Sequence, residues 1–509
     1  MSVNRAVLPA SLYTAEQTRA LDSTAINQFG IPGIRLMQRA GHAVFAEMLE
    51  RYPKVKSITV LCGAGNNGGD GFVIAALAIQ KGLDVQLVCI GDSNFEGSLK
   101  GEALEAWQQL QVLDIEYQLY EEGILFRGEL IVDALLGTGL SGDVRGLFEE
   151  AIVQVNRAET VVFSVDIPSG LCADTGRVLG VAIKADITVS FIGLKRGLLT
   201  GDAVDLCGQL LFDDLKVPGQ VYETCPIECL QITDADLKRV LPVRSRRSHK
   251  GLFGHVLVIG GDHGMGGAAL LAAEAAMRSG AGLVSLATRS EHVSAALCRC
   301  PEVMVKAVDS VKQLQPLLNN ADVIVLGPGL GQNAWSEQMV WAALVAEKPI
   351  VLDADALNIL VKDDLFSEFD EKQREKWLLT PHPGEAARIL SETVAELEFD
   401  RFGALKRLQA VCGGTVVLKG AGSLISSGGL THLCHAGNPG MAVGGMGDVL
   451  SGICGAFLAQ GATPEDAACI GVYVHANAAD RVACTQGEIG MRASDLFSTL
   501  SKVINSKYE

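Results

Sequence analysis

A glycine-rich turn followed by one aspartate is the feature of this sequence best suited to chemistry. Gly444, Gly445 and Gly447 lie just ahead of Asp448, and an apolar segment that predicts a buried helix comes next. Glycines let the backbone approach a ligand closely, and the free N–H groups and dipole of a helix start favour an anion. The same dipole is expected to keep Asp448 ionised and able to take a proton from a hydroxyl group. The motif therefore predicts transfer of a phosphoryl group to an alcohol.

Three further loops of the same half follow predicted strands. Lys419-Gly-Ala-Gly-Ser423 offers an ammonium group and backbone donors that would hold a nucleotide phosphate, although a Walker A loop places its lysine after the glycines. His382 lies between two prolines in the rigid, non-helical loop Thr380–Glu385. Taken alone, His382 is better explained as a hydrogen-bonded turn residue. The third loop is Gly327-Pro-Gly-Leu-Gly331.

Three strand ends in the N-terminal half also carry polar groups. Gly63–Gly71 has the glycines of a dinucleotide-binding loop, but its spacing does not fit GxGxxG followed by a helix. Asp133–Gly142 and Asp166–Gly170 each place a carboxylate at the mouth of the predicted sheet. The alternative for each loop taken alone is a structural role. Tight packing would explain one glycine-rich loop, and each aspartate would cap the helix that follows it. The convergence of three strand ends favours a binding site.

The oxygens available at these strand ends predict a cation site. Asn67, Asp133 and Ser169 would supply an amide, a carboxylate and a hydroxyl group. Ligands of this kind suit hard cations.

Parallel sheets are the elements that would bring such loops together. Short apolar runs without clean alternation predict strands that are buried on both faces, and ligands bind beyond the carboxyl ends of these strands. The rhythm of strands and helices is interrupted between residues 216 and 250. We therefore predict an α/β protein with two domains, 1–225 and 226–509. The predicted strands are 57–62, 84–90, 129–134 and 160–166 in the first, and 255–261, 282–287, 321–326, 349–353, 377–379 and 415–419 in the second.

The overall composition limits the partners and the compartment. A net charge of −17 over 509 residues argues against a nucleic-acid partner and against an anionic membrane surface. The first thirty residues lack a secretory signal, and no apolar run reaches spanning length. The 13 cysteines are scattered and show no zinc-ligand spacing. These features predict a cytoplasmic protein without disulfides.

The N-terminal motifs together resemble the NAD(P)H-hydrate epimerase family over residues 10–220. The resemblance is carried by Asn66-Asn-Gly-Gly-Asp-Gly71, Asp133-Ala-Leu-Leu-Gly-Thr-Gly139 and Asp166-Ile-Pro-Ser-Gly170. It implies a Rossmann-like three-layer α/β/α fold that interconverts the two C6 epimers of hydrated NADH or NADPH.

The same resemblance implies roles for individual residues. K⁺ would be bound by Asn67, Asp133 and Ser169. Epimerisation needs a reversible proton shuttle, for which we nominate Asp166 as the acid and base. The implied substrate-binding residues are Asn66, Asn67, Gly68, Gly69, Asp70, Gly137, Thr138, Gly139, Leu140, Ser141, Gly142, Asp143 and Asp166.

The C-terminal motifs resemble the ribokinase-like superfamily, in which an aspartate after Gly-x-Gly activates a hydroxyl acceptor. More narrowly, Thr380–Glu385, Lys419–Ser423 and Asn438–Asp448 are similar to the ADP- or ATP-dependent NAD(P)H-hydrate dehydratases, over residues 230–500. The resemblance implies a ribokinase-like α/β/α domain. In it, Asp448 would activate the C6 hydroxyl of the hydrate for attack on the terminal phosphoryl group of the nucleotide.

Binding residues follow from this second resemblance as well. Mg²⁺ is expected with ADP or ATP, because the phosphates need charge neutralisation. The hydrate would contact Ala268, Gly331, His382 and Asp448, and the nucleotide would contact Lys419, Gly420, Ala421, Gly422, Ser423 and Gly447.

The two resemblances on one chain imply a fused bifunctional repair enzyme of the kind typical of bacteria, for which ADP is the usual phosphoryl donor. Its small-molecule substrates would be the hydrates of NADH and NADPH together with ADP or ATP, and the family implies a homo-oligomer. The alternative is a ribokinase-like small-molecule kinase whose N-terminal half is a non-catalytic binding module. A kinase would release a phosphorylated product, whereas a dehydratase would release inorganic phosphate.

Overall fold

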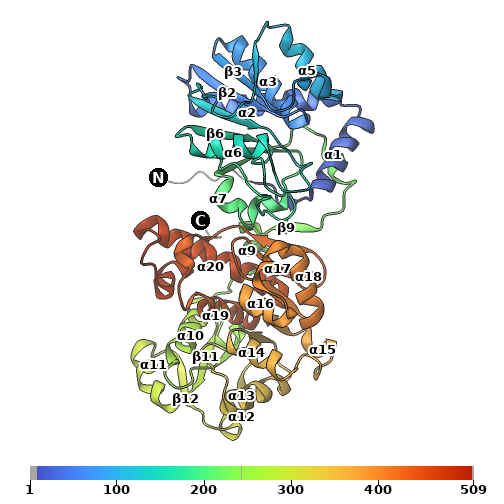
Figure 1. The fold of residues 1–509 in the computed structure, drawn as a ribbon. Helices are drawn as coiled ribbons and strands as arrows, with labels where there is room; N and C mark the ends of the chain where they lie inside the picture. The colour runs from blue at the N-terminus through green and yellow to red at the C-terminus, as the bar shows by residue number, and fades with distance from the viewer. Residues whose placement is uncertain (1–7, 242, 507–509) are drawn as a thin grey trace. The chain divides into compact units, whose positions relative to one another are not determined.

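The computed structural model describes residues 8–241 and 243–506, which form two compact α/β units (Figure 1). The first, unit 1, ends at Cys229, and the second, unit 2, begins at Leu230. Each unit is built on a sheet of mainly parallel strands, so the predicted α/β fold class is confirmed. Within these two ranges no helix combines the length and the apolar character needed to cross a membrane.

The strand order of the parallel sheet in unit 1 changes direction at β2 (Ser57–Cys62). Strand β2 pairs with β3 on one side and with β5 on the other, so the strands that precede β5 and those that follow it extend the sheet in opposite directions. Such a switch point opens a crevice beyond the carboxyl ends of the two central strands. The sheet order is β4 (Tyr117–Leu119), β3 (Asp84–Cys89), β2, β5 (Leu130–Ala134), β6 (Val161–Val165), β7 (Ile187–Phe191) and β8 (Gln209–Asp213).

Helices cover both faces of this sheet. Val60 and Cys62 of β2 pack into a core with α1, α2, α3 and α5, whereas Leu61, between them, packs into a second core with α6. Successive strand residues point to opposite faces, so the unit has three layers. The remaining elements of unit 1 are β1 (Ser11–Leu12), α1 (Ala15–Asn27), α2 (Gly33–Arg51), α3 (Asn66–Lys81), α4 (Phe95–Ser98), α5 (Gly101–Gln111), α6 (Leu147–Arg157), η1 (Arg196–Leu199), α7 (Ala203–Leu206) and α8 (Gly219–Tyr222).

The sheet of unit 2 is parallel through most of its width and ends in an antiparallel hairpin. Strand β10 (His255–Ile259) is its switch point, since it pairs with β11 on one side and with β13 on the other. The order from one edge is β12 (Met304–Ala307), β11 (Leu283–Thr288), β10, β13 (Val323–Leu326), β14 (Ile350–Leu352), β15 (Trp377–Leu379), β16 (Thr415–Leu418), β17 (Ser423–Ser426) and β18 (Thr431–Cys434), with β9 (Cys229–Gln231) at the unit boundary.

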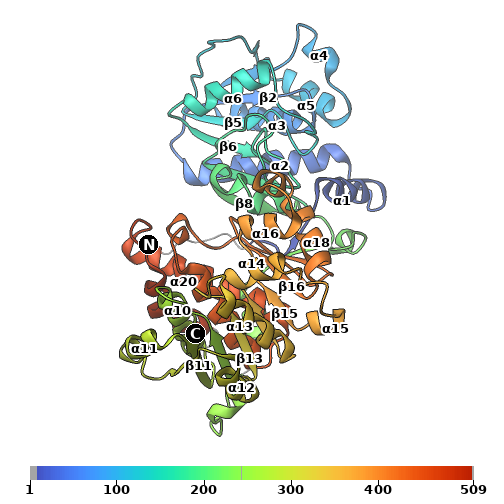
Figure 2. The ribbon, with the colours of Figure 1, turned by 60° about the horizontal axis from the view of Figure 1, so that its bottom comes forward.

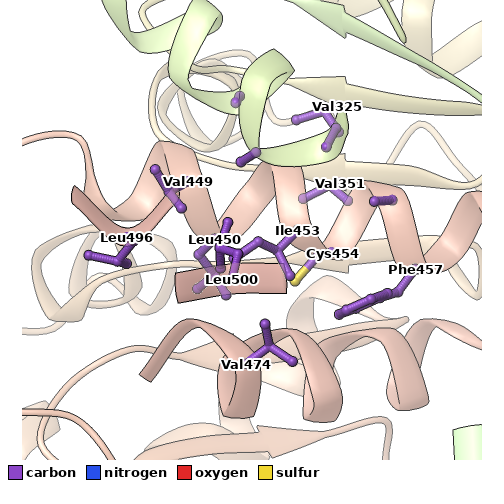
Figure 3. Close-up of a cluster of buried hydrophobic side chains, with 14 of the residues drawn as sticks. Val325, Val351, Val449, Leu450, Ile453, Cys454, Phe457, Val474, Leu496 and Leu500 are labelled. Carbon is purple, nitrogen blue, oxygen red and sulfur yellow. The ribbon is translucent and has the colours of Figure 1, made fainter. Parts of the chain in front are cut away.

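Helix α19 (Met446–Ala459) lies at the centre of the core on one face of this sheet. It packs between α10 (Gly266–Arg278) and α20 (Pro464–Gln486), and Figure 3 shows Ile453 and Cys454 of α19 among valines of the central strands. Helices α12 and α13 contact the sheet but contribute nothing to that core, so they cover the other face (Figure 2). The other helices are α9 (Asp234–Val240), η2 (Lys250–Phe253), η3 (Ser290–His292), α11 (Val293–Arg299), α12 (Val311–Asn320), α13 (Ala334–Val345), α14 (Asp355–Lys362), α15 (Glu371–Arg374), α16 (Pro383–Leu390), α17 (Val394–Phe399), α18 (Arg401–Cys412), η4 (Pro439–Met441), η5 (Ala493–Leu496) and α21 (Phe497–Ile504).

All ten strands predicted from apolar runs are present, with ends that differ by at most two residues. The sequence analysis missed others, among them β7 and β8. Strand β7 alternates Thr188 and Ser190 with apolar residues, so it lacks the continuous apolar run used to find its neighbours. The 13 cysteines all lie within the described residues, and each is a free thiol, as predicted.

The close packing of α19 on α10 can be tested by a substitution at the contact between the two helices. A Cβ atom on Gly452 would collide with the carbonyl oxygen of Ala272 on α10. Substitution Gly452→Ala is therefore expected to cost about 1–3 kcal/mol of folding free energy through overpacking. Calorimetry should show a lower melting temperature for the transition that contains unit 2.

Gly267→Ala on α10 is the matched control, because a Cβ atom there meets nothing within 4 Å. This variant should be unchanged or more stable by at most about 1 kcal/mol, from helix propensity. Equal melting temperatures for Gly452→Ala and the wild type would contradict the tight α10–α19 contact.

Candidate active sites

Unit 1 has a cavity of about 840 Å³ beyond the carboxyl ends of β2, β5 and β6. The segments that follow these strands form its wall. Most of the predicted substrate-binding residues of this unit line it, namely Asn66, Asn67, Asp70, Gly137, Thr138, Gly139, Leu140, Ser141, Gly142, Asp143 and Asp166.

Helix α3 begins earlier than the sequence analysis predicted. The run 66–70, expected to be a loop, is the start of the helix, with Gly65 as its N-cap. Gly68 and Gly69 do not line the cavity. A Cβ atom on Gly68 would collide with the carbonyl of Gly63, and one on Gly69 with the side chain of Met37. These glycines let α3 start directly against the end of β2, which brings Asp70 to the cavity.

Asp166 lies at the end of β6 in an ion pair with Lys195. The Lys195 side chain is only 1% exposed, and its ammonium group also donates to Ser190 Oγ (3.1 Å) and to the Phe191 carbonyl (3.3 Å). Asp166 has a φ of +68°, a strained conformation for a residue with a side chain. The sequence analysis missed Lys195, because it follows β7, a strand that was not predicted.

Two further carboxyl groups face the same cavity. Burial raises the pKa of Asp22, on α1, to about 6, and Asp166 adds to this shift while Lys195 opposes it. Burial also raises the pKa of Asp70 well above its ordinary value, with contributions from the charges of Asp166 and Asp22. The single ammonium group of Lys195 therefore interacts by charge with three carboxyl groups. Asp22 was not singled out from the sequence, where it is one polar residue on an amphipathic helix.

Two of the predicted cation ligands, Asp133 and Ser169, are in contact with each other and do not line the cavity, whereas the third, Asn67, lines it. Asp133 and Ser169 are fully buried, and Asp133 accepts hydrogen bonds from the backbone N–H of Ser169 (2.9 Å) and from Ser164 Oγ (2.8 Å). Asn67 packs beside Gly137, and its side-chain nitrogen is buried with no hydrogen-bond partner among the described residues. Burial raises the pKa of Asp133, although hydrogen bonds from Ser169 and Ser164 oppose the shift. These oxygens fit a hard monovalent cation beside a buried carboxylate.

In unit 2, Asp448 lies in the first turn of α19 and lines a cavity of about 470 Å³. Burial, with the charge of Asp353, raises the pKa of Asp448 to about 6, while Lys419 opposes the shift. Burial is therefore the largest influence on the pKa of this carboxyl group. A carboxylate with this pKa is ionised at neutral pH and is a better proton acceptor than an ordinary aspartate.

Lys419 is held beside the start of α19 by a buried aspartate. Its Nζ donates to Asp353 Oδ1 (2.9 Å) and lies 4.0 Å from Glu385 Oε2. Ser451 of α19 donates to Asp353 Oδ2 (2.7 Å). A Cβ atom on Gly447 would lie 3.2 Å from Lys419 Nζ, so the glycine leaves room for the ammonium group.

This ion pair sets the charge of the unit 2 site. Burial raises the pKa of Asp353, but Lys419 and the hydrogen bond from Ser451 outweigh it, and the net pKa is lowered. Burial raises the pKa of Glu385 to about 7. Asp353 and Glu385 were not predicted as site residues. Asp353 carried a usable signal, since it ends a predicted strand in the same way as Asp166.

His382 has the structural role that its sequence position suggested. Its Nδ1 accepts from the backbone N–H groups of Gly384 (3.0 Å) and Glu385 (3.4 Å), so the ring caps α16. Burial lowers the pKa of His382, with a contribution from Lys419. A neutral ring that accepts at Nδ1 carries its proton on Nε2, and the residue also lines the cavity with Asp448.

The remaining predicted residues of unit 2 lie away from the Asp448 cavity. Ala268 and Gly331 both lie near Met265, and the N–H of Gly331 donates to Asp355 Oδ2 (2.9 Å). The run 420–423 follows β16, where Arg401 donates to the carbonyls of Lys419 and Gly422. The structure thus brings Lys419, His382, Gly447 and Asp448 together, and leaves Ala268, Gly331, Gly420, Ala421, Gly422 and Ser423 outside that cavity.

Comparison with known proteins covers nearly the whole chain. A family model described as NAD(P)H-hydrate dehydratase matches residues 256–502, and one described as YjeF-related protein N-terminus matches residues 33–197. The bifunctional NAD(P)H-hydrate repair enzyme of Coxiella burnetii is 45% identical over 97% of this chain and 99% of its own length. The protein of the same name from Escherichia coli is 42% identical over 99% of this chain and 96% of its own length.

A solved structure supports the fold of unit 2. A ribokinase-like superfamily protein from Enterococcus faecalis is similar with a TM-score of 0.50 and 30% identity, over 55% of this chain and 96% of its own. The predicted ribokinase-like fold of the C-terminal part is therefore confirmed. The matches favour the repair-enzyme hypothesis over the small-molecule kinase.

The Lys419–Asp353 pair predicts a pH-dependent loss of stability in the variant Lys419→Met. In the wild type the pKa of Asp353 lies below its ordinary value, so the pair stabilises the fold above that value and is lost only in more acidic solution. Without the ammonium group, a buried carboxylate is left unpaired, which costs about 3–5 kcal/mol near neutral pH. Melting temperatures between pH 5 and 8 should show the largest deficit at the alkaline end, because protonation of Asp353 relieves the cost.

Lys362→Met is the matched control. Lys362 pairs with Glu337 at 2.6 Å, but both side chains are well exposed, at 52% and 36%. Its loss should cost less than about 1 kcal/mol at every pH. A deficit for Lys419→Met that is no larger than this would contradict a buried pair.

Proposed function

The chain belongs to the family of bifunctional NAD(P)H-hydrate repair enzymes, and from this premise we propose how its two units divide the work. The protein epimerises the R and S forms of hydrated NADH and NADPH. It also dehydrates the S form to NADH or NADPH with ADP or ATP, releasing AMP or ADP and phosphate. We assign epimerisation to residues 1–225 and dehydration to residues 226–509.

Asp448 is the residue on which the dehydratase assignment mainly rests. It faces the unit 2 cavity from the first turn of α19, next to Gly447 and the ammonium group of Lys419. This arrangement places a base beside an ammonium group and the N–H groups of a helix start, which suit phosphoryl transfer to an alcohol. The nucleotide would bind at Gly447, Lys419 and the run 420–423, and the hydrate at Asp448, His382, Ala268 and Gly331.

The chemistry of dehydration follows from these roles. Asp448 accepts the proton of the C6 hydroxyl as its oxygen attacks the terminal phosphoryl group. Lys419 and the N–H groups of the helix start stabilise the charge on the phosphoryl oxygens. The ring nitrogen then expels phosphate from C6, and loss of a C5 proton forms the C5–C6 double bond. We expect Mg²⁺ to accompany the nucleotide, whose phosphate charge it neutralises.

In unit 1 the hydrate would occupy the cavity lined by Asp70, Asp166 and the run 137–143. Gly68 and Gly69 would act only through the position of α3, because neither faces the cavity. Asn67, Asp133 and Ser169 would hold K⁺, which supplies positive charge beside the buried carboxylate of Asp133. The buried amide nitrogen of Asn67 has no hydrogen-bond partner among the described residues, and as a donor it would serve an acceptor oxygen of the hydrate and not the cation.

Two further properties are proposed for the whole chain. Thirteen free thiols suit a reducing compartment, for which we propose the cytoplasm. A homo-oligomer is proposed from the family resemblance.

Recovery of NADH from a mixture of both epimers tests the two activities at once. With ADP or ATP and Mg²⁺, the wild type should convert the mixture completely, with one phosphate released for each NADH formed. Asp166→Ala should convert the S epimer rapidly and the remainder only at the spontaneous epimerisation rate. Absorbance of NADH and a phosphate assay follow both steps.

The possible results separate the activities. Conversion by the wild type that stops at the S epimer would leave the dehydratase and remove the epimerase. A phosphorylated product that accumulates without phosphate release would instead support the small-molecule kinase.

The raised pKa of Asp448 predicts how dehydration depends on pH. The base must be ionised, so kcat/KM for the S epimer should rise with pH through a midpoint near 6. Asp448→Asn should lower kcat by about 10²–10⁴-fold and should lack this inflection. Steady-state rates between pH 5 and 8 measure both effects, and a flat wild-type profile would argue against Asp448 as the base.

A further inference from the structure

More than one carboxyl group that could act as an acid or a base lines the unit 1 cavity. Asp166 extends from the end of β6, and Asp70 from the first turns of α3, so the two carboxyl groups reach one cavity from different elements. Lys195 pairs with Asp166 and not with Asp70. The two groups therefore differ in their electrostatic surroundings although they share one cavity.

We propose that Asp70 and Asp166 form an acid–base pair in which Asp70 donates the proton and Asp166 accepts it. The inference rests on the proposed epimerase function and assigns its two proton-transfer steps. Lys195 and Asp22 are positioning residues, since they act on the pair by charge. Neither Lys195 nor Asp22 was expected to have any role from the sequence.

The charges around Asp70 support this division of roles. Asp22 from α1 and Asp166 after β6 raise its pKa, and burial raises it most. Lys195 acts to lower the pKa of Asp70, but its ammonium group is in contact with Asp166. Burial also raises the pKa of the Cys62 thiol on β2, and the charge of Asp70 adds to that shift. Burial and the neighbouring charges thus favour the protonated form of Asp70, beside an Asp166 carboxylate that is ion-paired with Lys195.

The substrate has one site for each group. C6 of the hydrate carries a hydroxyl and is bonded to the ring nitrogen N1. Asp166 accepts the hydroxyl proton, the C6–N1 bond breaks as the C6 carbonyl forms, and Asp70 gives its proton to N1. Rotation about the C5–C6 bond exposes the other face of the carbonyl. Ring closure then returns the N1 proton to Asp70 and the Asp166 proton to oxygen, which leaves both residues as they began.

The substitution Asp70→Asn tests the assignment. It keeps the size of the side chain and removes the proton donor, so kcat for epimerisation should fall by about 10²–10⁴-fold, while KM changes little. In the wild type, kcat/KM should decline at alkaline pH as Asp70 loses its proton, and the variant should lack this decline. Glu105→Gln, at an exposed position of α5 outside the cavity, is the matched control and should keep the wild-type rate and profile.

The melting transition of unit 1 shows whether the variant protein folds, and dehydration of pure S epimer by the same chain shows that unit 2 is unaffected. A raised carboxyl pKa stabilises the fold below its unfolded value and loses that contribution as pH rises through the folded value. Asp70→Asn should therefore melt at a higher temperature than the wild type at pH 8, with a smaller difference at pH 5. Infrared spectra at pH 7 should show a protonated carboxyl band in the wild type that weakens in Asp70→Asn, where Glu385, with its pKa of about 7, still contributes.

The results separate this inference from the proposed function. A wild type that epimerises no faster than the spontaneous reaction would remove the epimerase itself. A wild type that epimerises, with Asp70→Asn at the same rate or with its alkaline decline intact, would overturn only the role of Asp70. A protonated carboxyl band of equal strength in the wild type and in Asp70→Asn would also overturn it.

Discussion

One buried lysine that must serve several carboxyl groups is the constraint on which both units depend. Lys195 pairs with Asp166 in unit 1, and Lys419 pairs with Asp353 in unit 2. Each ammonium group lies among more carboxyl groups than it can neutralise. The group in contact with the lysine is stabilised as a carboxylate, and the others are left with the cost of burial. Raised pKa values at Asp70 and Asp448 are the result.

Glycine packing makes this concentration of charge possible. In both units a helix begins directly against the end of a strand, because the residues at the contact have no side chain. Gly68 lies against the carbonyl of Gly63, and Gly447 lies against the ammonium group of Lys419. A larger residue at Gly68 would push α3 away from the end of β2 and move Asp70, whereas one at Gly447 would crowd the Lys419 ammonium group beside Asp448. The first glycine therefore acts through the placement of an aspartate, and the second through the room it leaves for the lysine.

Sequence reasoning predicted more of the fold than of the site. Apolar runs located ten strands, since a strand buried on both faces must be continuously apolar, but β7 escaped because Thr188 and Ser190 interrupt it. The helix start at Asn66 was also missed, because its glycines are typical of loops. Site residues were predictable where they belong to a sequence motif. Lys195 and Asp353 lie far along the chain from the aspartates they influence, so only the folded chain shows their contact with the site.

The two reactions explain why the sites differ although both are built on a strand end, a glycine-rich helix start and one lysine. Epimerisation inverts C6 without transferring any group to another molecule and returns both catalytic protons, so it needs a donor and an acceptor that can exchange protons in both directions. Asp70 and Asp166 line one cavity, and Lys195 forms an ion pair with Asp166, so the two groups are suited to these opposite roles. Dehydration is driven by phosphoryl transfer, so a single base suffices, and the positive charge must be available to the incoming phosphate. Lys419 lies against Gly447 at the start of α19 and is therefore placed to serve a phosphate as well as Asp353. The chain thus uses the same local arrangement twice. In our proposal, the group with which the lysine ammonium interacts distinguishes the reactions of the two units.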